Sequence, residues 1–361
     1  MATQDLPTLD ALQAQFGAAD VLRRMQGDAV AALGLGPSEC SYRIVASGSH
    51  WRLRDYGDQG ASNSLLIIAA PIKRPYIWDL APSVSAIRFC LEHGLRVYLL
   101  EWLPATRESN GIGLDDCALA ISACVAHVSR EGGGAKPFLA GHSLGGTLAA
   151  ISAASAPDSI SGLMLFGAPL CFQPEQSSFR DALVSLVPPG LPDASPFPGS
   201  LLSQMSALAS PETFVWSRWI DAMLSLSDRQ AMEIHARVER WALDEVALPG
   251  KLVQQIIDWL YRENRFSRGT LQIGEALVGP ATMSAPVLAV VNTADDVAPM
   301  VSLKPFTDAM PSMNARVIEY PGEIGVCLQH LGILIGHEAR ATVWPKIIAW
   351  IGLNSPARST P

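Results

Sequence analysis

The hexapeptide at residues 141–146, Gly-His-Ser-Leu-Gly-Gly, constrains the fold of this chain more than any other feature. A short apolar run at 136–140 precedes it, and an alanine-rich stretch at 147–155 follows it. These stretches have the length of a buried strand and the composition of a helix. A serine in a sharp strand-to-helix turn approaches positive φ, and neighbouring glycines remove the bulk that would clash there. The G-x-S-x-G pattern therefore predicts a nucleophile elbow, with the hydroxyl of Ser143 raised above a sheet.

The composition is that of a globular protein with a large core. Hydrophobic residues make up 49% of the 361 residues and charged residues 17%, so the chain is long enough for one large domain or two. The formal net charge is −8 and no run of lysine or arginine is present, which argues against a nucleic-acid partner. No apolar run approaches the roughly 20 residues of a membrane helix, so no transmembrane segment is expected.

The N-terminus and the cysteines indicate a cytoplasmic protein. The opening residues are acidic and polar, without a basic start and an apolar stretch, so no secretory signal is expected. The six cysteines show no C-x-x-C pairing and lie mostly in apolar or helical surroundings. We interpret them as reduced thiols.

Strand-like and helix-like segments alternate along most of the chain. Apolar residues at helical spacing mark 8–34, which we interpret as one or two helices that either pack on the domain or dock a partner. Residues 41–57 alternate as a hairpin does. A continuous apolar run, typical of a strand buried on both faces, lies at 64–70, and a further buried strand is predicted at 95–102. Other strand-like segments lie at 160–166, 285–291 and 315–320. Helical patterns lie at 87–93, 114–130 and 338–351. This alternation predicts a mostly parallel sheet with helices on both faces.

The alternation stops between residues 172 and 275, where no clear buried strand is present. A proline-rich stretch at 186–199 excludes regular structure, and helical patterns follow it. We interpret 172–275 as an inserted helical cap. Its aromatic residues and one methionine are either core or the wall of an acyl pocket, with core favoured for most; they are Trp216, Trp219, Met223, Trp241, Trp259 and Tyr261. The expected domains are an N-terminal helical segment 1–40, an α/β core 41–171 and 276–353, the cap, and a flexible tail 354–361.

A nucleophilic serine needs a base, and the base needs an acid that orients it. In enzymes that carry such an elbow on an α/β sheet, the acid and then the histidine follow the serine on loops after later strands. Only His330 and His337 lie beyond the strand that ends at Val291, and Asp295 and Asp296 come soon after that strand. The residues alone therefore leave two candidates for each role.

Several further segments resemble the catalytic domain of polyhydroxyalkanoate synthases. The similarity covers roughly residues 40–352 and rests on segments 71–79, 94–102, 114–116, 238–244, 266–269, 285–288, 330–332 and 344–350. It implies an α/β-hydrolase fold with a cap, and an acyltransferase that polymerises hydroxyacyl-CoA through a covalent acyl-enzyme. The chain length is similar to that of the short synthases, which act with a separate partner subunit.

Matched to this family, Ser143 takes the place of the nucleophile, which is normally a cysteine. Asp295 matches the family's acid because it lies four residues before Pro299. His330 matches the family's histidine because a hydrophobic residue and a glycine follow it. The stretch between Gly322 and His330 departs from the family, since it is longer than the family's pattern.

The serine in place of cysteine changes the expected chemistry. A cysteine beside a histidine can rest as a thiolate, whereas a serine stays neutral until the base takes its proton. Acyl transfer from CoA to Ser143 would convert a thioester into a less reactive oxyester. We therefore favour a serine hydrolase that cleaves hydroxyacyl esters or polyesters over a polyhydroxyalkanoate synthase. A noncatalytic protein that binds polyester granules or a partner is a third hypothesis.

The remaining site residues surround this triad. The N–H groups of Leu144, at the start of the elbow helix, and of Ile72 are the expected oxyanion donors. His142, Trp216 and Trp219 are the candidate substrate-binding residues. No metal and no organic cofactor are expected, because the sequence contains no P-loop, G-x-G-x-x-G pattern or metal-ligand cluster. The expected substrate is an ester, a polyester or a hydroxyacyl-CoA, and the expected assembly is a homodimer or a complex with a partner subunit.

Overall fold

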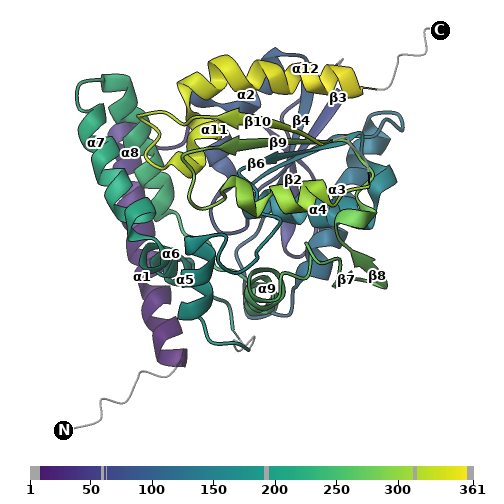
Figure 1. Ribbon diagram of the computed structural model, residues 1–361. Coiled ribbons are helices and arrows are strands. Elements are labelled where there is room, and N and C mark those ends of the chain that lie inside the picture. The colour runs from purple at the N-terminus through teal and green to yellow at the C-terminus, as the bar shows by residue number, and fades with distance from the viewer. Residues whose placement is uncertain (1–8, 58–60, 62, 191–194, 312–314, 356–361) are drawn as a thin grey trace.

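A computed structural model describes residues 9–57, 61, 63–190, 195–311 and 315–355. Figure 1 shows a twisted sheet with helices above and below it, and a further group of helices at one side. Three sequence predictions fall partly outside the described residues. They concern the first eight residues of the N-terminal segment, residues 191–194 of the proline-rich stretch, and residues 356–361 of the expected tail.

An eight-stranded sheet forms the centre of the molecule, in the order β1-β2-β4-β3-β5-β6-β9-β10. Its strands are β1 (Arg43–Ser47), β2 (Trp51–Asp55), β3 (Asn63–Ile68), β4 (Leu95–Trp102), β5 (Phe138–His142), β6 (Gly162–Phe166), β9 (Val287–Asn292) and β10 (Ala315–Tyr320). β2 is antiparallel to β1 and to β4, and every pair from β4 to β10 is parallel. This confirms the predicted mostly parallel sheet. A separate ribbon pairs β7 (Leu271–Ile273) with β8 (Ala276–Val278).

Helices cover both faces of the sheet, as the alternation of segments predicted. α3 (Leu114–Glu131) and α4 (Leu144–Ser155) cover one face. α2 (Ala86–Glu92), α11 (Gly332–Ile335) and α12 (Trp344–Asn354) cover the other. The short helix α10 (Lys304–Asp308) connects β9 to β10.

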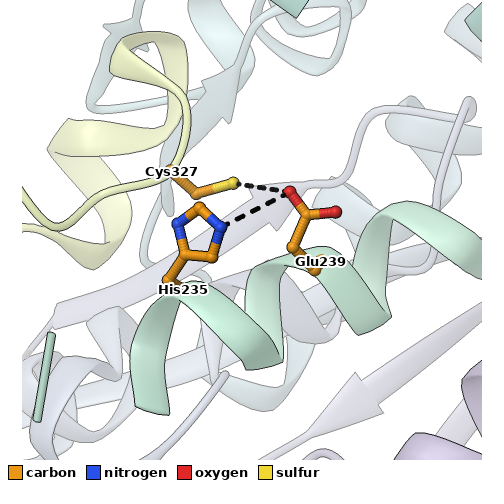
Figure 2. Close-up of side chains that lie close together, drawn as sticks. All are labelled: His235, Glu239 and Cys327. Atoms are coloured by element: carbon orange, nitrogen blue, oxygen red, sulfur yellow. Dashed lines mark hydrogen bonds and ion pairs between the residues drawn. The ribbon is translucent and has the colours of Figure 1, made fainter. Parts of the chain in front are cut away.

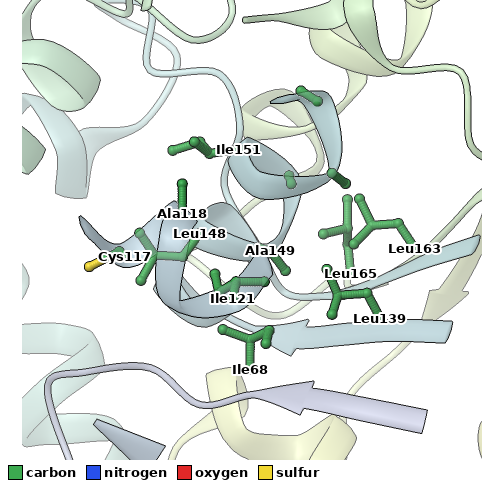
Figure 3. Packing of buried hydrophobic residues seen from close by; sticks show 14 of the residues in the cluster. Ile68, Cys117, Ala118, Ile121, Leu139, Leu148, Ala149, Ile151, Leu163 and Leu165 are labelled. Atoms are coloured by element: carbon green, nitrogen blue, oxygen red, sulfur yellow. The ribbon is translucent and has the colours of Figure 1, made fainter. Parts of the chain in front are cut away.

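The buried strands contribute side chains to two separate cores. In β3, Leu66 and Ile68 pack in the cluster under α3 and α4, whereas Leu65 and Ile67 pack in the cluster on the opposite face. Successive side chains of a strand point to opposite faces, so a strand covered on both sides has a continuous apolar run. Figure 3 shows Ile68 and Leu139 against the helices of the first cluster. The apolar pattern of these strands is thus explained by burial on both faces.

A group of helices, here called the helical layer, lies beside the sheet. It consists of α1 (Leu9–Val30), α5 (Ser178–Leu186), α6 (Gly199–Ala209), α7 (Ser217–Ser225), α8 (Arg229–Leu243) and α9 (Gly250–Gln255). α1 packs against α6 and α8. The carboxylate of Asp20 on α1 accepts hydrogen bonds from the backbone N–H groups of Gly199 and Ser200, 3.2 and 2.8 Å long. The N-terminal helix is therefore part of this layer. None of the described helices is both long and apolar enough to span a membrane.

The aromatic residues of the helical layer are more exposed than the sequence analysis expected. Trp216, Trp219 and Met223 are 61, 68 and 65% exposed. The other three residues that were candidates for the core or the pocket, Trp241, Trp259 and Tyr261, are half-buried. Trp241, Trp259 and Tyr261 pack against the two cores, so the expected core position holds for these three residues and is wrong for the other three. On α7 the buried side chains are instead Asp221 and Ser225, because the polar side of this helix faces the protein.

Candidate active site

The elbow between β5 and α4 has the geometry that its glycines predicted. Ser143 lies between the strand and the helix with φ 54° and ψ −134°. A Cβ atom on Gly141 would lie 2.5 Å from the backbone nitrogen of Gly146, and one on Gly145 would lie 2.4 Å from the carbonyl oxygen of Ile68. No side chain fits at such distances. The close approach of backbone to backbone at this turn therefore requires both glycines.

Backbone hydrogen bonds hold Ser143 in this conformation. Its N–H donates to the carbonyl of Phe166 at the end of β6, at 3.0 Å. Its carbonyl accepts from the N–H groups of Gly146 and Thr147, at 2.9 and 3.1 Å. Leu144 is the first residue of α4, where an N–H has no partner within the helix. The turn thus directs a backbone donor toward the region around the serine.

Asp295 and His330 meet on the loops that follow β9 and β10. The Nδ1 atom of His330 lies 2.6 Å from Oδ2 of Asp295, and both side chains are buried. The other carboxylate oxygen accepts from the N–H groups of Val297 and Ala298 at 2.9 and 3.3 Å. Burial opposes ionisation of Asp295, but the histidine and these hydrogen bonds together lower its pKa below the ordinary value. Asp295 is therefore an anion that holds the proton of His330 on Nδ1.

The two alternative residues lie outside this arrangement. Asp296 and His337 are both exposed. The structure thus brings together one aspartate and one histidine of the four candidates, those that the family resemblance selected.

The second nitrogen of His330 is buried and has no hydrogen-bond partner among the described residues. His330 and Ser143 line the same cavity. With the proton held on Nδ1 by Asp295, Nε2 presents its lone pair as an acceptor. An unsatisfied buried acceptor is costly unless a donor reaches it during function. The geometry therefore leaves His330 able to take a proton from a group in the cavity.

His142 supports the backbone of His330. Their rings lie 4.5 Å apart between centroids, and Nε2 of His142 donates to the carbonyl of His330 at 2.7 Å. Complete burial, followed by the neighbouring His330, lowers the pKa of His142 to about 3. His142 is therefore a neutral donor that positions the histidine loop, and it also lines the cavity.

The cavity has a volume of about 580 Å³ and lies between the elbow and the helical layer. Phe16 of α1, Phe179 of α5 and Val253 of α9 contribute to its largely apolar wall. Its size and lining are typical of small-molecule sites. The position of α1 in this wall was not predictable from the sequence, because an amphipathic pattern does not reveal what the apolar side of a helix covers.

The remaining predicted site residues divide into two groups. Leu144 and Ile72 line the cavity. Trp216 and Trp219 are not among the residues that line it, and their side chains are exposed to solvent instead. Their neighbours Phe214, Val215 and Arg218 face the cavity from the same helical stretch. In this helical stretch, the residues that line the cavity are therefore the neighbours of the two tryptophans.

Comparisons with known proteins agree with this architecture. A family model of the alpha/beta hydrolase fold matches residues 78–195. Among solved structures, a monoglyceride lipase from Saccharomyces cerevisiae is 11% identical with a TM-score of 0.56, covering 89% of this chain and 97% of that one. A carboxylesterase structure from Nitrososphaera gargenis is 17% identical with a TM-score of 0.51, covering 87 and 98%. These structural similarities establish the fold.

The curated relatives are polymerase subunits. The poly(3-hydroxyalkanoate) polymerase subunit PhaC of Haloferax mediterranei is 29% identical over 298 residues, which are 81% of this chain and 59% of that protein. The corresponding subunit of Allochromatium vinosum is 24% identical over 289 residues, 80% of each chain. The chain therefore spans less than two thirds of the haloarchaeal relative. The chain therefore has the α/β-hydrolase fold and is similar to poly(3-hydroxyalkanoate) polymerase subunits.

Proposed function

We propose that the protein is an enzyme that hydrolyses carboxylic esters, including hydroxyacyl esters or polyesters, through an acyl-enzyme on Ser143. The observation that carries this proposal is the free Nε2 acceptor of His330. This nitrogen belongs to a histidine that pairs with the buried Asp295. His330 and the strained Ser143 line the same cavity. A serine, a base and an orienting acid in this chain order are the parts of a nucleophilic site.

In the acylation step, Nε2 of His330 takes the hydroxyl proton of Ser143 while the oxygen attacks the ester carbonyl. The anionic carboxylate of Asp295 stabilises the imidazolium that forms. The tetrahedral intermediate then collapses, the bond from the carbonyl carbon to the alcohol oxygen breaks, and the imidazolium returns its proton to the alcohol. Water, deprotonated by His330, then attacks the carbonyl carbon of the acyl-serine. The bond from that carbon to Oγ of Ser143 breaks, the imidazolium returns the proton to Oγ, and the carboxylic acid leaves.

The oxyanion of each tetrahedral intermediate needs donors opposite the attacking oxygen. The N–H of Leu144 is the first proposed donor, since it lies at the free start of α4 and the residue lines the cavity. The second is the N–H of Ile72, which follows β3 and also lines the cavity. Two such donors in a site closed to water contribute a large share of the rate enhancement of acyl-transfer enzymes.

A second candidate function is acyl transfer to a growing polyester. It is favoured by the curated relatives, which are polymerase subunits for poly(3-hydroxyalkanoate). In this reaction the hydroxyl of a hydroxyacyl group, rather than water, attacks the acyl-serine. Transfer from an ester to an alcohol is nearly balanced in free energy, so a serine nucleophile permits this reaction. The oxyester is nonetheless less reactive than the thioester that a cysteine forms. We therefore favour hydrolysis over polymer synthesis.

Covalent labelling by a fluorophosphonate tests the nucleophile. We expect wild type to react stoichiometrically and Ser143→Ala to lose labelling while its thermal unfolding midpoint stays unchanged. Ser155→Ala serves as a matched control, since Ser155 lies at the far end of the same helix. Equal labelling of wild type and Ser143→Ala would show that the nucleophile is elsewhere. Absence of labelling in wild type would favour a noncatalytic protein that binds granules or a partner.

Product analysis distinguishes the two acceptors. The purified protein is incubated with a 3-hydroxyacyl-CoA, and in parallel with a short p-nitrophenyl ester. Release of free acid and p-nitrophenol without oligomer supports the hydrolase, and accumulation of oligomer or polymer supports the transferase. Both reactions depend on Ser143, so the Ser143→Ala variant provides the blank for each.

A further inference from the structure

A second polar cluster borders the cavity, where the helical layer meets the loop before His330. It consists of His235 and Glu239, one turn apart on α8, and Cys327 from the long stretch that departs from the family pattern. Figure 2 shows the imidazole, the carboxylate and the thiol directed toward one another. His235 and Cys327 are buried and Glu239 is half-buried. The proposed ester chemistry uses none of them.

The distances within this cluster suit a shared cation. The Sγ atom of Cys327 lies 3.3 Å from Oε1 of Glu239, and Nε2 of His235 lies 3.7 Å from the same oxygen. One ligand atom from each residue lies within 4.8 Å of the others. Tetrahedral zinc sites with bonds of about 2.0 to 2.3 Å place their ligand atoms at similar separations. The three side chains therefore need little movement to bind one ion.

A fourth residue fixes the orientation of the imidazole. Nδ1 of His235 lies 3.1 Å from Oδ2 of Asp221 on α7. The same carboxylate accepts from the backbone N–H groups of Gly325 and Cys327, at 2.7 and 2.8 Å. Because Nδ1 faces Asp221, Nε2 is the ring nitrogen of His235 that faces Glu239 and Cys327. A carboxylate that orients a histidine in this way is the usual outer partner of a metal-bound imidazole.

The charges of the cluster also favour a cation. The guanidinium of Arg218 donates two hydrogen bonds to Glu239, of 2.9 and 2.5 Å. It is one positive charge beside the two carboxylates of Asp221 and Glu239, so the carboxylates outnumber the guanidinium. A divalent cation that displaces the thiol proton adds two positive charges and one negative, which is a net gain of one positive charge beside these carboxylates. Isolated charge is costly at buried positions, so this positive charge stabilises the bound state.

We propose that His235, Glu239 and Cys327 form a binding site for a thiophilic divalent cation of the Zn²⁺ type, with Asp221 as the orienting partner. Binding forms bonds from the metal to Nε2, to a carboxylate oxygen and to Sγ, and the thiol proton leaves to solvent. The bound ion joins α8 to the loop that ends at His330.

Cobalt titration of the full chain tests this site, with Co²⁺ as a spectroscopic substitute for Zn²⁺. After treatment with a chelator, wild type is titrated with Co²⁺ and then with Zn²⁺ in competition. We expect a thiolate-to-cobalt charge-transfer band that saturates at one ion per chain and disappears on addition of Zn²⁺. Absence of the band, together with no zinc retained after dialysis, would overturn the proposal. Neither measurement depends on catalysis, so it is independent of the proposed esterase function.

Variants assign the ligands. Cys327→Ser removes the charge-transfer band, whereas Cys171→Ser, which changes a buried cysteine outside the cluster, retains it. His235→Gln weakens Zn²⁺ binding at least about tenfold, and Asp221→Asn weakens it by about 10- to 100-fold while the band remains. A band of unchanged intensity in Cys327→Ser would refute the assignment.

X-ray absorption of the wild-type zinc complex decides the question if Cys327→Ser does not fold. One sulfur ligand at about 2.3 Å, with nitrogen or oxygen ligands at about 2.0 Å, supports the site. A coordination shell without sulfur overturns it.

Discussion

The sheet and the helical layer use apolar residues in opposite ways. In the sheet, the apolar side chains of β3 are fully buried, because helices cover both faces. In the helical layer, α7 exposes Trp219 and Met223, 68 and 65% accessible, and buries Asp221 and Ser225. An apolar pattern therefore indicates burial in a strand that helices cover on both faces. In a helix with one side exposed to solvent, apolar residues can lie on the exposed side.

The polar cluster explains why α7 is oriented in this way. The carboxylate of Asp221 accepts hydrogen bonds from the N–H groups of Gly325 and Cys327 and faces His235. If α7 were rotated so that Asp221 faced solvent, these buried donors would lose their partner. Each such loss costs about 1 to 3 kcal/mol. The apolar residues of α7 are therefore left on the outer surface.

The largest expected effect concerns the proposed catalytic residues, which lie on loops of the sheet. Asp295→Asn should lower kcat for ester hydrolysis by about 10⁴-fold, because the amide cannot hold the required tautomer or stabilise the imidazolium. Steady-state kinetics with a p-nitrophenyl ester measures this loss.

Asp296→Asn is the matched control, since it is the next residue and is exposed. It should change kcat less than about twofold, as a surface substitution normally does. Equal losses in the two variants would show that the pairing of Asp295 with His330 is not what activates the site.

The next effect concerns stability. Phe138 on β5 is 1% exposed and packs edge-on against Trp350, with ring centroids 5.9 Å apart. Phe138→Ala should lower the free energy of unfolding by about 3 to 5 kcal/mol through lost burial and the cavity that remains. Urea denaturation measures the change.

Trp219→Ala removes an equally large aromatic residue from the helical layer and sharpens the contrast. It should change the free energy of unfolding by less than about 0.5 kcal/mol, because Trp219 is already largely exposed. A loss comparable to that of Phe138→Ala would mean that the outer side of α7 is covered in solution.

The last effect is a pH dependence that arises at the boundary between the two regions. The pKa of His142 falls from an ordinary 6.5 to about 3 in the folded protein. Between these values the unfolded chain binds the proton and the folded chain does not, so folding is destabilised as the pH falls below 6.5. The contribution is at most about 1.4 kcal/mol per pH unit. Urea denaturation at several pH values between about 4.5 and 6.5 measures the slope.

His142→Gln keeps a donor for the carbonyl of His330 but does not titrate, so it should reduce this slope. His337→Gln should leave it unchanged, since His337 is exposed. An identical slope in wild type and His142→Gln would show that His142 is protonated in the folded protein.

Much of the architecture was predictable, because the signals were local. The elbow is determined by two glycines that no side chain can replace, and the central strand β3 by an apolar run that burial on both faces explains. The order of serine, acid and histidine left two candidates for each partner. The structure then placed Asp295 and His330 2.6 Å apart and the other two in solvent.

The orientation of the helical layer was not predictable from the same signals. Trp216 and Trp219 resembled pocket residues, yet the cavity is lined by their neighbours Phe214 and Arg218. The cluster of His235, Glu239 and Cys327 was also hidden, since 88 residues separate Cys327 from Glu239 in the chain. Neither property follows from spacing along one segment.

The sequence by itself determined the α/β sheet, the elbow that presents Ser143 and a short set of partners for it, because backbone geometry and two-sided burial act over a few residues. Only the tertiary structure decided which aspartate meets which histidine, which side of α7 faces inward and what surrounds Cys327. These outcomes depend on contacts between segments that are distant in the chain, where the cost of leaving buried polar groups unpaired selects the arrangement.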